Sequence, residues 1–237
     1  MLRIDHISIA TQNLFEAADH LRAQTGLGYY DGGWNAAGLA ARIFPLGAGG
    51  YIVLEGIVDV HAVHDPLRPG TKRFFDAVAA AGEHFRGFTL AVDSLPDLEY
   101  IATRRASRIY WSATGSRTRP NGTSVQIAQT PSIGEAWSSG MPNWCFLPEP
   151  STHPGGQKVV STTGLVTPRG IVRIEVGGSE QQMSRWLGHP ASRLPMVFNG
   201  RAPGLYAVTV STDRGEVTIR RPAAAAVAGT LPVTRSG

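Results

Sequence analysis

Two ionisable side chains, His6 and Glu55, interrupt stretches that are otherwise typical of buried β-strands. His6 lies in MLRIDHISIA, among alternating isoleucines, and Glu55 lies in the almost wholly apolar stretch YIVLEGIV. Burying either group is unfavourable unless it has a partner or takes part in binding or catalysis. Imidazole and carboxylate groups are common general acids and bases and common metal ligands. His6 and Glu55 are therefore the first candidates for a functional site.

Side chains alternate between the two faces of a strand, which predicts the face that each candidate occupies. Asp5, Ile7 and Ile9 are expected on the face that packs against the following helix, so His6 points the other way. The same alternation in YIVLEGIV allows Glu55 to share the face of His6. We therefore expect the two side chains to meet on one concave sheet surface, close enough to share a metal ion, a water or a substrate atom.

Each candidate also has a purely structural interpretation. His6 can be a strand histidine that is hydrogen-bonded to a neighbour, and Glu55 can form an ion pair with an arginine such as Arg42 or Arg173. We assign no role to the remaining histidines, which are His20, His61, His64, His84, His153 and His189.

A strand, a capped helix and further strand-like runs occur three times along the chain. The helices are expected to begin after Asn13, Ser94 and Ser179, each with an acidic or amide residue three positions later, as in a capping box. Short runs rich in apolar residues follow each helix, with turn sequences such as Asn121-Gly122 between them. This pattern predicts an α+β fold of repeated βαβββ modules, which must pair to bury the open face of each sheet or to enclose a ligand.

The spacing of these signals sets the expected boundaries. We expect the first module over residues 1–60, a linker with a helix over 61–84, the second module over 85–150, and a third, shorter module over 165–221. Residues 222–237, PAAAAVAGTLPVTRSG, are of low complexity and predict a flexible tail.

Composition narrows the class of protein. Of the 237 residues, 42% are hydrophobic and only 17% are charged, which favours a globular protein with a large core. The single cysteine, Cys145, excludes an intrachain disulfide and a zinc site made of several cysteines. The net charge of +4 comes without a nucleic-acid-binding motif, and no stretch has the length of a membrane span or the pattern of a signal peptide. We expect a cytoplasmic protein whose partner is a small molecule, not nucleic acid or a membrane.

The modules resemble the vicinal oxygen chelate superfamily and, more narrowly, the glyoxalase-like domain proteins that are common in actinobacteria. The resemblance covers about residues 1–221 and is carried by IDHISIATQNLFEAADHL, GYIVLEGI, RGFTLAVDSLPDLE, MPNWCFL and YAVTVSTDRGEVTIR. It implies that modules pair into a cup within one chain or between two chains, so the sequence also allows a homodimer. It further implies that the first and last strands of a module hold a divalent metal, at the positions of His6 and Glu55.

The second module departs from this pattern at the metal positions. Gly87 and Phe146 stand where metal ligands are expected, and Asn35 stands where relatives often have a histidine. Three protein ligands are the usual minimum for a catalytic metal. The expected cofactor is therefore either none or a single divalent metal on an incomplete set, His6 and Glu55.

Two functions fit these residues. One is an enzyme acting on a small, oxygen-containing, ring-bearing metabolite by isomerase, lyase or ring-opening hydrolase chemistry, with His6 and Glu55 as a base pair or as metal ligands. The other is a binding or resistance protein that sequesters an aromatic natural product without turnover. Strand alternation in MPNWCFL would place its tryptophan and second aromatic residue on one face. The residues expected to contact the ligand are Trp34, Asn35, Trp144 and Phe146.

Overall fold

The computed structural model describes residues 2–34, 38–47, 50–65, 69–104, 109–111, 127–130, 141–148, 153–156, 165–221 and 233–236. The first half of the fold consists of β1 (Arg3–Thr11), α1 (Leu14–Thr25), β2 (Tyr30–Trp34), β3 (Leu39–Pro45), β4 (Tyr51–Ile57), a 3-10 helix (Val60–His64), α2 (Pro69–Ala81), β5 (His84–Ala91) and α3 (Leu95–Arg104). The second half consists of β6 (Tyr110–Trp111), β7 (Ala128–Gln129), β8 (Met141–Phe146), a 3-10 turn (Pro154–Gly156), β9 (Pro168–Val176), α4 (Glu180–Leu187), a 3-10 turn (Ala191–Arg193), β10 (Met196–Phe198), β11 (Leu205–Thr212), β12 (Gly215–Arg220) and β13 (Val233–Ser236).

Within the part of the chain that the structure describes, eight strands form one sheet in the order β2-β3-β4-β1-β5-β8-β7-β6. β1 pairs in parallel with β4, β5 pairs in parallel with β8, and β1 and β5 pair antiparallel in the middle. The two halves of the sheet therefore repeat one strand order around the β1–β5 pair. This arrangement confirms the predicted α+β fold of paired βαβββ modules.

A second sheet follows in the chain, with the described strands in the order β10-β9-β11-β12-β13. It begins with a strand and a capped helix, as predicted, and Ser179 with Gln182 forms the full capping box of α4. Residues 233–236 belong to the stretch predicted as a tail, but they form β13, which pairs with the edge of β12. The tail prediction is wrong there, because an open sheet edge can pair with any nearby extended segment, whatever the complexity of its sequence.

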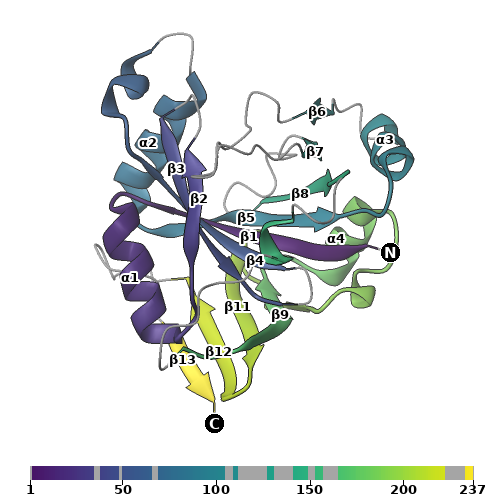
Figure 1. The fold of residues 1–237 in the computed structure, drawn as a ribbon. Helices are drawn as coiled ribbons and strands as arrows, with labels where there is room; N and C mark the ends of the chain where they lie inside the picture. Colours follow the sequence, from purple (N-terminus) through teal and green to yellow (C-terminus); the bar gives the residue numbers. More distant parts are fainter. Residues whose placement is uncertain are drawn as a thin grey trace.

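The main hydrophobic core lies between the two sheets. Ile7 and Ile52 from the large sheet and Ile174 and Val208 from the second sheet are fully buried in one cluster. Figure 1 shows β9, β11 and β12 below the central strands β1, β4 and β5, with α1 along one side. We call the large-sheet face that contributes to this cluster the core face. None of the helices in the described residues is long and apolar enough to cross a membrane.

The opposite face of the large sheet, which carries His6, Tyr51 and Val53, is called the cup face. The 3-10 turn Pro154–Gly156 packs against β3 on this side, and the hydroxyl of Tyr30 donates a hydrogen bond to the carbonyl of Pro154 at 3.0 Å. Helix α2 lies across the other end, where its apolar side contacts β1. The two ends of the cup face are therefore covered by different linkers.

Candidate functional site

A bulge in β1 places Asp5 beside His6. In the ladder between β1 and β5, Ile4 faces Leu90 and His6 faces Thr89, so Asp5 is an extra residue without a partner. Such a bulge reverses the alternation of side chains along the strand. Asp5 consequently shares the side of His6, whereas Ile4 joins the core. The predicted orientation of Asp5 is wrong, because alternation holds only along an uninterrupted ladder.

The Asp5 carboxylate accepts hydrogen bonds from two histidines. Nδ1 of His6 lies 2.7 Å from Oδ2, and Nε2 of His153 lies 2.8 Å from Oδ1. The backbone N–H of Gly155 donates to Nδ1 of His153 at 2.9 Å. His153 must therefore carry its proton on Nε2, and this N–H group donates a hydrogen bond to Asp5. Both carboxylate oxygens of Asp5 are thus satisfied by ring N–H groups.

Charge is strongly stabilised at Asp5, although the residue is only 4% exposed. Burial alone would raise the pKa of this carboxyl, but the hydrogen bonds from His153 and His6 outweigh burial and hold the pKa well below its usual range. At Cys145 the effect is opposite, since burial and the charge of Asp5 raise the pKa of the thiol well above its ordinary value. Asp5 is therefore an anion at neutral pH, and Cys145 is an unreactive thiol.

The second ring nitrogen of His6 faces a hydroxyl group. Nε2 lies 3.0 Å from Oγ1 of Thr89, which is also hydrogen-bonded to the side-chain amide of Asn143. The imidazole stacks on the ring of Tyr51 with 4.6 Å between centroids. A threonine hydroxyl can donate or accept, and an amide offers both an acceptor and a donor. Thr89 and Asn143 can therefore satisfy Nε2 of His6 whether or not it carries a proton.

Glu55 lies on the cup face, as predicted, but away from His6. In the parallel β1–β4 ladder His6 faces Tyr51, whereas Glu55 faces Ala10. Four residues along a strand correspond to about 13 Å. The carboxylate of Glu55 instead forms an ion pair with Arg86. The expectation that His6 and Glu55 share one atom is wrong, because strand alternation fixes the face of a side chain but not its position along the ladder.

The described residues do not fit a divalent metal at these positions. His6 uses both ring nitrogens in hydrogen bonds, and Glu55 contacts a guanidinium group. Among the residues that the structure describes, no three histidine, cysteine, aspartate or glutamate side chains are grouped so that they could hold a metal ion. In the part of the chain that the structure describes, His6 and Glu55 therefore do not form a metal site.

Metal analysis tests this conclusion. We expect the protein, purified without added transition metals, to contain substoichiometric zinc, iron, manganese and nickel by plasma mass spectrometry, because incomplete ligand sets bind metal weakly. Treatment with a chelator should leave the melting temperature unchanged. A stoichiometric metal that survives the chelator would show that other residues complete a site.

The predicted aromatic contacts lie elsewhere. Trp144 is 1% exposed and stacks on Trp186 of α4 with 3.9 Å between centroids, and Phe146 packs against the same core. Their common face is thus the core face, which corrects the prediction that they line the cup. Trp34 is 61% exposed at the end of edge strand β2, opposite Ala40 of the main core. Asn35 lies outside the described residues.

The residues around His6 that the sequence prediction missed come from four separate segments. Asp5 is adjacent to His6 in the chain, and this Asp-His pair is the one signal that the sequence offered. Thr89, Asn143 and His153 reach the site through strand pairing and a distant turn. These three carry no sequence signal, because contacts across a sheet depend on register.

Three comparisons with known proteins show which proteins this chain is similar to. The model of the glyoxalase-like domain family matches residues 4–190. A solved structure of a hypothetical protein from Staphylococcus aureus superposes with a TM-score of 0.64 at 11% identity, over 91% of this chain and 93% of that chain. A methylmalonyl-CoA epimerase from Mycobacterium tuberculosis matches with a TM-score of 0.44 at 13% identity, over 62% of this chain and 89% of the epimerase. The search of curated proteins gave no match.

Proposed function

Because the chain belongs to the family of glyoxalase-like domain proteins, we propose that it is an enzyme that transfers protons on a small organic molecule, with His6 as the general acid and base. The observation that supports this proposal is the Asp5–His6–Thr89 chain of hydrogen bonds on the cup face. Proton transfer of this kind covers isomerase and lyase reactions and the opening of an oxygen-containing ring.

Asp5 gives His6 the properties of a general base. The carboxylate accepts the proton on Nδ1, so Nε2 is the basic atom, and the negative charge of Asp5 stabilises the imidazolium that forms when Nε2 takes a proton. His153 donates a hydrogen bond to the other carboxylate oxygen, which prevents the carboxylate of Asp5 from rotating away from His6. Asp5 and His153 are positioning residues in this mechanism, and His6 is the residue that would exchange a proton with the substrate.

The environment of Nε2 suits a group that gains and loses a proton. In the structure the hydroxyl of Thr89 donates to Oδ1 of Asn143, so its oxygen can accept a hydrogen bond from Nε2 of a protonated His6. When His6 is neutral, Thr89 can instead donate to Nε2 and accept from the side-chain amide of Asn143, which requires only rotation of the hydroxyl and of the amide. Both states can therefore be satisfied without movement of the backbone.

The substrate class follows from the neighbours of His6. Tyr51, which stacks on His6, and Tyr30 belong to an apolar cluster on the cup face, and Thr89 and Asn143 are the polar neighbours of His6. We propose a small molecule with a ring and a carbonyl group, whose acidic C–H bond is broken by Nε2. Sequestration of such a molecule without turnover is the alternative that the following experiment separates.

Hydrogen–deuterium exchange in D2O detects proton abstraction whatever the net reaction is. Saturation-transfer NMR first selects cyclic ketones, lactones and aryl 2-keto acids that bind the protein. Each compound that binds is then incubated with the protein in D2O, and the loss of the NMR signal of the C–H group next to the carbonyl is followed. We expect His6→Ala to slow the exchange by about 10²–10⁴-fold, the usual contribution of a general base. Binding should change only a few-fold, since a base acts mainly in the transition state.

His61→Ala is the matched control, because His61 is an exposed histidine in the 3-10 helix Val60–His64. The control should exchange at the rate of the wild type. If compounds bind and none exchanges, the protein is a binding protein. If His6→Ala exchanges as fast as the wild type, His6 is a structural strand histidine.

A further inference from the structure

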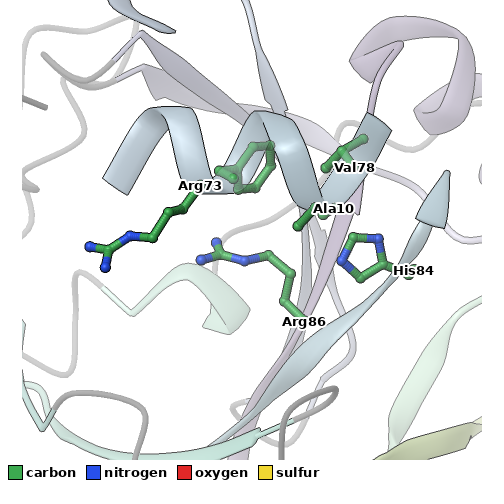
Figure 2. A pocket seen from close by; sticks show the side chains of 7 residues that line it. Ala10, Arg73, Val78, His84 and Arg86 are labelled. Carbon is green, nitrogen blue, oxygen red and sulfur yellow. The ribbon is translucent and has the colours of Figure 1, made fainter. Parts of the chain in front are cut away.

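A cavity of about 320 Å³ opens between helix α2 and the strands β1 and β5, at the end of the cup face away from His6. Its lining is divided into an apolar part, Ala10, Phe74, Ala77 and Val78, and a polar part, Arg73, His84 and Arg86. Figure 2 shows the side chains of Arg73 and Arg86 extending into the same opening from opposite walls, helix α2 and strand β5. The basic groups and the apolar surface thus face one space.

Arg86 is held in place by its neighbours. It is the extra residue of a bulge in β5, since Ser8 faces Gly87 whereas Ile9 faces Phe85. The guanidinium group forms an ion pair with Glu55 and lies over the ring of Phe74, 4.9 Å from its centroid. A guanidinium group has five N–H donors, and one carboxylate uses at most two of them in parallel. Arg86 therefore keeps donors for a ligand in a fixed position.

Arg73 has no such partner. Among the residues that the structure describes, it makes no hydrogen bond and no ion pair, although its neighbour Lys72 pairs with Asp76 at 2.6 Å. Two guanidinium groups at one opening repel each other, and Glu55 compensates only one of them. The cavity consequently has a net positive charge that an anion would neutralise.

His84 adds a hydrogen-bond acceptor to the wall. Its Nδ1 donates to the carbonyl of Gly82 at 2.8 Å, which leaves Nε2 without that proton in the neutral ring. Burial lowers the pKa of His84, and the charges of Arg86 and Arg221 lower it further, against the opposing effect of the Gly82 hydrogen bond. His84 is therefore neutral at pH 7 and can accept a hydrogen bond from a ligand hydroxyl group.

We propose that this cavity binds a small organic anion, with its carboxylate or phosphate group between Arg73 and Arg86 and its apolar body against Phe74 and Val78. The planar fork of arginine matches the two oxygens of either group. The volume lies at the lower end of the range for small-molecule sites. Because His6 is four residues away along β1, this site goes beyond the proposed acid–base function and does not depend on it.

Calorimetric titration with matched probes tests the proposal. Benzoate and phenyl phosphate carry the two anionic groups on one ring, and benzamide is the neutral counterpart of benzoate. We expect both anions to bind the wild type and benzamide to bind at least about tenfold more weakly, because charge-assisted hydrogen bonds are about twice as strong as neutral ones. Arg73→Gln should weaken binding of the anions by about tenfold or more.

Lys72→Gln is the control, because it removes the same charge from the adjacent position of α2, where the side chain pairs with Asp76. It should bind both anions like the wild type. Arg73 is exposed, so its replacement should leave the melting temperature unchanged, whereas Arg86→Gln would also remove the ion pair with Glu55. His6→Ala should also bind the anions normally, which separates this site from the proposed catalytic function.

Tighter binding of benzoate would identify a carboxylate site, and tighter binding of phenyl phosphate a phosphate site; both results support the proposal. Three results would overturn it. They are equal affinity of the anions for the wild type and Arg73→Gln, equal affinity of benzoate and benzamide, and no heat of binding for either anion with the wild type.

Discussion

Replacing Trp144 by alanine is expected to lower the free energy of unfolding by about 3–5 kcal/mol, the usual loss for a large aromatic residue in a core. Trp144 is 1% exposed and stacks on Trp186 of α4. The substitution removes this contact between the large sheet and the second sheet's helix, and the stacked pair adds about 0.5–1.5 kcal/mol beyond the buried area. Denaturant titration measures the change through the transition midpoint.

Trp34→Ala is the matched control, because Trp34 is 61% exposed. We expect its effect to be within about 0.5 kcal/mol, as for most surface substitutions. If Trp144→Ala does not fold, Trp144→Phe keeps a smaller ring in the core and should show an intermediate loss. A loss as small as that of Trp34→Ala would contradict the placement of Trp144 between the sheets.

Asp5→Ala is expected to destabilise the protein by about 2–6 kcal/mol, because it leaves one buried and one partly buried N–H donor without an acceptor, at about 1–3 kcal/mol each. These donors are Nδ1 of His6 and Nε2 of His153. Asp76→Ala on the exposed side of α2 removes a carboxylate that pairs with Lys72 four residues away, so it should cost about 0.5 kcal/mol or less. Equal losses for the two variants would show that Asp5 is not buried between the histidines.

The effect of Asp5→Ala should depend on pH in a defined direction. The pKa of Asp5 in the folded protein lies below its ordinary value of 3.8, so the unfolded chain binds a proton first as the pH falls. The stabilisation by the Asp5 carboxylate is fully present above about pH 5 and is lost progressively below it. The difference in unfolding free energy between the wild type and Asp5→Ala should therefore shrink from pH 5 toward pH 2. A difference that grows in acid would contradict the lowered pKa.

Much of the fold could be predicted from local patterns. Apolar alternation, helix caps such as Ser179 and turn sequences predicted the strands, the helices and the repetition of a βαβββ unit. These signals are local, because the side-chain period of a strand or a helix depends on its own backbone geometry. The same patterns also identified His6 and Glu55 as polar residues on the cup face of a strand.

The candidate site depended on tertiary structure. A one-residue bulge turns Asp5 toward His6. No pattern in MLRIDHISIA predicts this bulge. The register between β1 and β4 separates Glu55 from His6 by four residues, and Thr89 reaches His6 only through the pairing of β1 with β5. Strand parity in the sequence determines which side chains share a face. Register, bulges and the packing of a second sheet decide which face is buried and which side chains meet, because these depend on contacts between segments that are distant in the chain.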